Sequence, residues 1–249
     1  MPGMDRRRYE KFTALRDVFR EKVRLWTAAV PELRDIQERL RIARGYDDYV
    51  VETPVVYNRA LDDIGPESRP RWILIADNPG KQEQKSANLR YLVGQSGKLA
   101  EGFFRRELDT DFRRDVLIVN KTPVHTPKTA ELALLRSLDA SGAVEALLAE
   151  SQAWMALFAR ALHEALGVPV WISGRSELKP KGIFGSWFRE YSRLYREAPA
   201  AVREEVLVFS HFSMNQFSIE LSRKRDPGRP LMEELRRIGA ENRRAIFNF

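Results

Sequence analysis

Polar side chains with acid–base and hydrogen-bonding capacity follow three short apolar segments of the chain. They are Asp77 and Asn78 after residues 72–76, Asn120 after residues 116–119, and His211 shortly after residues 206–209. A carboxylate can orient a water molecule or stabilise a cation, and an amide can pair with the donor and acceptor edge of a heterocycle. A histidine can donate a hydrogen bond to a developing oxyanion. Each residue alone is typical of an ordinary turn, but the combination predicts a binding or catalytic site.

The apolar segments have the length and composition of strands that are covered on both faces. Four such segments occur, at residues 72–76, 116–119, 168–172 and 206–209. Helical patterns separate them, at residues 97–108, 129–138 and 142–166. This alternation predicts an α/β fold, a three-layer α/β/α sandwich around a central, mainly parallel four-stranded sheet. In this class of fold, ligands bind beyond the carboxyl ends of the strands.

The first 45 residues have a different pattern. Apolar residues from Phe12 to Trp26 recur at steps of three or four, which predicts an amphipathic helix, and a second helix is expected between Pro31 and Gly45. We interpret residues 1–45 as an N-terminal helical extension and residues 70–220 as the core. No Gly/Ser linker separates them, so residues 1–249 are expected to form a single domain.

A glycine-containing segment follows the first polar pair. Pro79-Gly80 predicts a turn, and Gly94, Ser96 and Gly97 open the next helical pattern. Backbone N–H groups at such a helix start can bind a phosphate, but the same residues also suit a turn followed by a helix cap.

Composition limits the functional classes. The chain of 249 residues has 42 Lys and Arg against 35 Asp and Glu, a net charge of +7 that suits a nucleic-acid partner. The absence of cysteine excludes disulfides, iron–sulfur clusters and cysteine zinc sites in this chain, and the three histidines are scattered, so we expect no metal and no cofactor. No apolar run approaches the ~18 residues of a membrane span, and no apolar segment of a signal peptide follows the start, so we expect a cytoplasmic protein without membrane contact.

The motifs resemble those of the uracil-DNA glycosylase superfamily. Ala76-Asp77-Asn78-Pro79-Gly80 is similar to its first motif, G-x-[D/N/A]-P-[Y/G], Asn120 stands at the second, and His211-Phe212-Ser213 is similar to its His-Pro-Ser motif. Residues 93–99, VGQSGKL, look most like the iron–sulfur (family 4) branch, whereas Asn-Pro-Gly looks like the mismatch-specific and single-strand-selective branches. The resemblance covers roughly residues 70–220.

The sequence also departs from the family pattern. It lacks the cluster cysteines, and Ala76 replaces the opening glycine of the first motif. Phe212 replaces the proline of His-Pro-Ser, and Leu92 stands where the family has a phenylalanine that stacks on the base.

The resemblance implies a monofunctional DNA glycosylase that flips out uracil or another modified base and hydrolyses its N-glycosidic bond. Asp77 and Asn78 would position water and stabilise the sugar cation, and His211 would bind the base oxygen. The implied base-binding residues are Asn120, Leu92, Tyr91 and Gly80. The implied DNA-binding residues are Ser96, Gly97, Lys121, Ser213, Met214, Asn215 and Phe217, with Met214 or Phe217 as an apolar wedge.

Three alternatives remain at this point. The chain could be a DNA-binding member of the superfamily without activity, which Phe212 and Leu92 favour. It could be a small-molecule nucleotide or phosphate enzyme, or an interaction protein whose N-terminal helices bind a partner that the sequence does not identify. The basic run Arg223, Lys224, Arg225 and Arg229 suits either phosphate contacts or a solvated loop.

Overall fold

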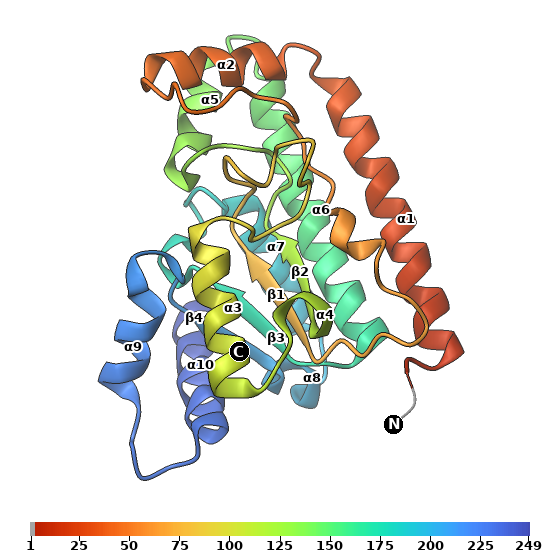
Figure 1. Ribbon diagram of the computed structural model, residues 1–249, viewed down its shortest axis with the longest axis vertical. Coiled ribbons are helices and arrows are strands. Elements are labelled where there is room, and N and C mark those ends of the chain that lie inside the picture. The colour runs from red at the N-terminus through yellow and green to blue at the C-terminus, as the bar shows by residue number, and fades with distance from the viewer. Residues whose placement is uncertain (1–2) are drawn as a thin grey trace.

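The central sheet of the protein has four parallel strands in the order β2-β1-β3-β4 (Figure 1). The computed structural model describes residues 3–249. The strands are β1 (Trp72–Ala76), β2 (Val116–Asn120), β3 (Val170–Ser173) and β4 (Val206–Phe209). All four predicted strands are present, and the predicted parallel sheet is confirmed. β3 begins after Pro169, two residues later than expected, because proline has no N–H to donate to a neighbouring strand.

Helices cover both faces of the sheet, which gives the predicted α/β/α layers. On one face, Ile73 and Ile75 of β1 share an apolar cluster with α5 (Leu132–Leu138), α6 (Ala143–Leu166) and α7 (Gly185–Arg196). On the other face, Trp72 and Leu74 share a cluster with α3 (Gln95–Leu108), α4 (Phe112–Asp115), α9 (Gln216–Lys224) and α10 (Leu231–Phe247). The short α8 (Ala200–Glu204) precedes β4. Alternating residues of each strand therefore belong to two separate apolar cores, one on each face of the sheet.

The N-terminal helices belong to the main core. α1 (Arg6–Ala29) lies along the outside of α6, and α2 (Leu33–Ala43) packs against α5 (Figure 1). Phe19 of α1 stacks with Trp154 at 5.7 Å between ring centroids and packs on Phe158 at 4.9 Å. The helices form as expected, and their apolar residues share one cluster with α6 and α7.

The C-terminal helix extends the core beyond residue 220. α10 packs closely on β4, and its Leu235 and Ile238 belong to the apolar cluster of that face. The close approach of α10 to β4 requires a glycine at position 239, because a Cβ there would come within 2.7 Å of Leu207. None of the helices within residues 3–249 combines the length and apolarity needed to cross a membrane.

Two neighbouring residues of α1 test whether this helix supports the core. Phe19→Ala is expected to lower the free energy of unfolding by about 3–5 kcal/mol, because it removes a fully buried ring from an aromatic cluster. Val18→Ala is the control, since Val18 is 52% exposed, and is expected to change stability by less than about 0.5 kcal/mol. Chemical denaturation measures both. Equal stabilities of the two variants would show that α1 is a detachable extension.

Candidate functional site

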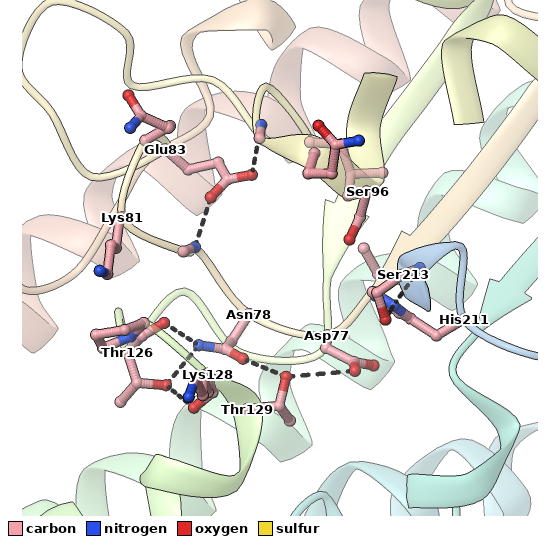
Figure 2. Close-up of a pocket in the computed structure, with 17 residues that line it drawn as sticks. Asp77, Asn78, Lys81, Glu83, Ser96, Thr126, Lys128, Thr129, His211 and Ser213 are labelled. Carbon is pink, nitrogen blue, oxygen red and sulfur yellow. Dashed lines mark hydrogen bonds between the residues drawn. The ribbon is translucent and has the colours of Figure 1, made fainter. Parts of the chain in front are cut away.

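A cleft of about 440 Å³ opens at the carboxyl ends of the strands. Its walls come from the loop after β1, the start of α3, the loop after β2 and the loop after β4 (Figure 2). Seven of the residues selected from the sequence line it: Asp77, Asn78, Gly80, Leu92, Ser96, His211 and Ser213. The structure thus brings together all three candidate catalytic residues, which are up to 134 positions apart in the chain.

Asp77 forms a buried ion pair beneath the cleft. Its Oδ1 accepts a hydrogen bond from the ammonium of Lys121 at 2.5 Å, and the same ammonium donates to the Ser173 carbonyl at 2.7 Å. Lys121 is 0% exposed, so the expectation that it contacts DNA is wrong: its charge is turned inward to the carboxylate. Gly174, with φ of 86°, lies so close to Asp77 that a Cβ would come within 2.7 Å of Oδ1.

Two threonines orient the carboxylate and the amide (Figure 2). Thr129 Oγ1 lies 3.0 Å from Asn78 Oδ1 and 3.4 Å from Asp77 Oδ2, so its single proton can serve either oxygen. Asn78 Nδ2 donates to Thr126 Oγ1 at 2.9 Å. Neither threonine was predicted from the sequence.

Glu83 joins the two loops that face each other across the cleft. Its carboxylate accepts hydrogen bonds from the backbone N–H of Gly80 at 2.6 Å and of Gly94 at 3.4 Å (Figure 2). Burial raises the pKa of Glu83, and these backbone N–H groups oppose the rise because they stabilise the ionised form. The sequence did not single out Glu83. The structure makes it the link between the Pro79-Gly80 turn and the start of α3.

The hydrogen bonds of His211 fix its tautomer. The backbone N–H of Ser213 donates to Nδ1 at 3.0 Å, and the Ser213 hydroxyl lies 2.6 Å from the same nitrogen. A nitrogen that accepts a backbone N–H carries no proton, so the neutral ring bears its proton on Nε2. Burial lowers the pKa of His211, the neighbouring Asp77 opposes this, and Lys121 reinforces it. The ring is therefore a neutral Nε2–H donor on the cleft wall.

The loop after His211 is exposed at Met214 and buried at Phe217. Met214 is 82% exposed, and both Met214 and Asn215 adopt left-handed backbone conformations, with φ of 53° and 57°. Phe217 is buried and packs on Phe103 at 4.8 Å and Phe212 at 4.9 Å. The alternative that Phe217 is the wedge is therefore wrong, whereas Met214 is free to contact a partner.

Of three other expected binding residues, Tyr91 and Gly97 do not line the cleft, whereas Leu92 does. Tyr91 is buried and its hydroxyl donates to the Val56 carbonyl, so it does not form the expected wall. Gly97 is buried where a Cβ would collide with the Leu92 carbonyl, so its packing role replaces the expected DNA contact. Leu92 does line the cleft, with φ of 54°, and Arg113 donates to its carbonyl at 2.7 Å.

Asn120 lies behind the cleft surface and does not line it. It is 2% exposed, and its Oδ1 has no hydrogen-bond partner in residues 3–249. Register places it beside Ala76, which does line the cleft. It is thus close to the site, but reaches a ligand only if the cleft extends inward past Ala76.

Basic side chains stand at the rim of the cleft. Lys81 and Lys128 line it, and Lys81 pairs with Asp48 at 2.7 Å and lies 4.2 Å from the Tyr46 ring centroid. No group of three or more His, Asp or Glu side chains in the described residues is placed to hold a metal ion.

Comparison of the chain with models of known protein families gave no match, and comparison with curated proteins gave none either. The resemblance to uracil-DNA glycosylases therefore rests on the motifs alone.

The tautomer of His211 can be tested without knowing the function. At pH 7 its ring is expected to be neutral with the proton on Nε2, which heteronuclear NMR of the ¹⁵N-labelled ring detects. Because burial lowers the folded-state pKa below 6.5, the unfolded chain binds the proton first as pH falls. The contribution of neutral His211 to the free energy of unfolding is therefore complete above pH ~6.5 and decreases below it. Protonation of Nδ1 also removes the bond from Ser213 N–H, so the Ser213 amide shift should follow the same midpoint. A proton on Nδ1 at pH 7 would contradict this assignment.

Proposed function

We propose that this protein is a DNA glycosylase that hydrolyses the N-glycosidic bond of uracil or another modified base after flipping it from the helix. The observation that carries the proposal is the convergence of a carboxylate–amide pair and a neutral Nε2–H histidine on one cleft. These groups match the two charges that develop in the reaction, positive on the sugar and negative on the departing base. The proposal includes a cytoplasmic location, as expected from the sequence.

In the proposed reaction, water adds to C1′ of the sugar and the C1′–N bond breaks, with its electron pair leaving on the base. Asp77 Oδ1 is occupied by Lys121, so Oδ2 is the oxygen available to orient the water and accept its proton. Asn78, held by Thr126 and Thr129, fixes the position of that water. His211 Nε2–H donates to the base oxygen as it becomes anionic, a contribution of about 3–4 kcal/mol by analogy with one oxyanion donor.

The surroundings of the cleft suit a polynucleotide. Ser96 at the start of α3 and Ser213 beside it offer hydroxyls to flanking phosphates (Figure 2). Lys128 adds positive charge at the rim, where Lys81 is paired with Asp48. Met214 projects beside His211 as an apolar wedge, the side-chain type that commonly enters base stacks.

A second candidate is a DNA-binding protein of the same fold without catalytic activity. The Lys121–Asp77 ion pair favours it, because a compensating ammonium reduces the electrostatic stabilisation that the carboxylate can give to a sugar cation. Under this alternative the pair is structural, and the cleft binds a flipped base without hydrolysing it.

The direct test is an assay for abasic sites in labelled oligonucleotides. These carry uracil, hypoxanthine, xanthine or a thymine mismatch, in single and double strands, and alkali reveals the cleavage. Asp77→Ala, Asn78→Ala and His211→Ala are each expected to reduce the rate by about 100-fold or more while DNA binding is kept. Asp63→Ala is the control, since this exposed carboxylate pairs only with Arg90 at the surface. Salt-sensitive DNA binding without any cleavage would support the inactive alternative.

The wedge can be tested through binding alone. Met214→Ala is expected to weaken binding to duplex DNA with a modified base severalfold, with a smaller effect on single strands, where no stacked base needs to be displaced. Met232→Ala, which shortens a part-exposed methionine on α10, is the matched control. Fluorescence anisotropy at several salt concentrations separates this effect from phosphate contacts, which determine the salt slope. An equal loss for both DNA forms would contradict the wedge.

A further inference from the structure

Two buried polar side chains at the carboxyl edge of the sheet have unpaired atoms. Asn120 Oδ1, at the end of β2, and Ser173 Oγ, at the end of β3, have no hydrogen-bond partner among residues 3–249. Their residues are 2% and 1% exposed. Most buried polar atoms in proteins are paired, so two unpaired ones at the ends of the strands that flank β1 need an explanation.

Strand register places these residues on either side of Ala76. Ala76 pairs with Asn120, and Ser173 follows Ile172, which pairs with Ile75. Side chains alternate along a strand, and Trp171 and Leu74 mark the α3 face of the sheet, so Ser173, Ala76 and Asn120 all belong to that face. Ala76 also lines the cleft. We call the position above its methyl group, between Asn120 and Ser173, the Ala76 recess.

The topology of the sheet favours a ligand at this position. The chain leaves β1 for α3 on one face of the sheet and leaves β3 for α7 on the other (Figure 1). β1 and β3 are neighbours, so the two connections diverge between them. In open α/β sheets the ligand crevice lies where neighbouring connections diverge in this way.

The width of the recess fits one ring. Neighbouring strands are about 4.8 Å apart, which separates Asn120 and Ser173 by about 10 Å. Two hydrogen bonds of about 2.9 Å each leave about 4 Å between the atoms that they reach. That span suits the opposite edges of a single six-membered heterocycle.

We infer that the Ala76 recess binds a six-membered heterocycle with polar atoms on opposite edges, and that Ser173 determines specificity by pairing with the edge opposite Asn120. This inference rests on the proposed function, for which it defines the ring that enters the site. A pyrimidine dione, or the six-membered ring of an oxidised or deaminated purine, has the required edges.

Entry of the ring requires one side chain to move. The unpaired atoms are closed to water in this structure, and Leu92 shares an apolar cluster with Ala76 where both line the cleft. Leu92 has a left-handed backbone conformation, which a leucine rarely adopts. In the proposed entry route the Leu92 side chain rotates away, and the ring then covers the apolar surface that Leu92 leaves.

The first experiment tests the unpaired hydroxyl by thermal unfolding and needs no activity. Ser173→Ala is expected to leave the melting temperature unchanged or raise it, because it removes a buried group without a partner. Ser192→Ala is the matched control, since Ser192 is equally buried but donates to the Phe188 carbonyl at 2.7 Å, and it should lower the melting temperature. An equal decrease for both variants would overturn the inference, because Ser173 would then have a structural partner.

The second experiment measures binding of free uracil and free hypoxanthine by NMR of the Asn120 side-chain amide. At least one base is expected to shift this signal, with a Kd about tenfold weaker in Ser173→Ala and unchanged in Ser192→Ala. Ala76→Val, which fills the recess, should abolish the shift. Absence of binding to the wild-type protein, or equal Kd values for wild type and Ser173→Ala, would overturn the inference.

These outcomes are distinguishable from failure of the proposed function. Base binding that depends on Ser173, without any cleavage of DNA, would support ring binding in the Ala76 recess and contradict the proposed glycosylase activity. Cleavage with the same kcat and KM for every base in wild type and Ser173→Ala would support the glycosylase activity and overturn the proposed role of Ser173 in the Ala76 recess.

Discussion

The buried ion pair between Lys121 and Asp77 is the interaction on which the geometry of the site depends. The ammonium bonds the Asp77 carboxylate and the Ser173 carbonyl, and the backbone N–H of Lys121 donates to the carbonyls of Ala76 and Asp77. One residue thereby ties together the ends of three adjacent strands. Removing one partner of a buried pair costs about 3–5 kcal/mol, because the remaining charge is left without compensation in the interior. The pair therefore fixes which carboxylate oxygen faces the cleft.

Around this pair, the walls of the cleft are held by polar contacts between loops. Thr129 connects Asp77 to Asn78, Glu83 connects the turn at Gly80 to the start of α3, and Ser213 orients His211. Each contact joins a side chain to a hydroxyl or a backbone group. These contacts hold Asp77, Asn78 and His211 in fixed relative positions, which favours precise orientation of a reacting group.

The sequence predicted the framework better than the orientation of the side chains. β1 and β4 have the bounds that their apolar runs indicated, because a short run of continuous apolar residues suits a strand covered on both faces. The resemblance implied that Lys121 contacts DNA, and only its ion pair with Asp77, 44 residues earlier, reverses that expectation. Thr129 was missed because its role depends on contacts with Asp77 and Asn78, about 50 positions away, which no local pattern encodes. The role of Phe217 was ambiguous because an apolar wedge and a core residue can be the same type of side chain.

Phe212, at the position where the His-Pro-Ser motif that His211-Phe212-Ser213 resembles has a proline, leaves His211 on the cleft wall. Phe212 stacks with Trp171 at 5.9 Å, and Phe217 packs against Phe212, so both ends of the loop are anchored in the core. The Phe217 N–H also donates to the His211 carbonyl at 3.0 Å, which closes the loop. Left-handed residues such as Met214 and Asn215 persist only where their surroundings hold them in place. Aromatic packing thus supplies the rigidity that a proline gives through its ring, and it holds Met214 outward beside a histidine of fixed tautomer.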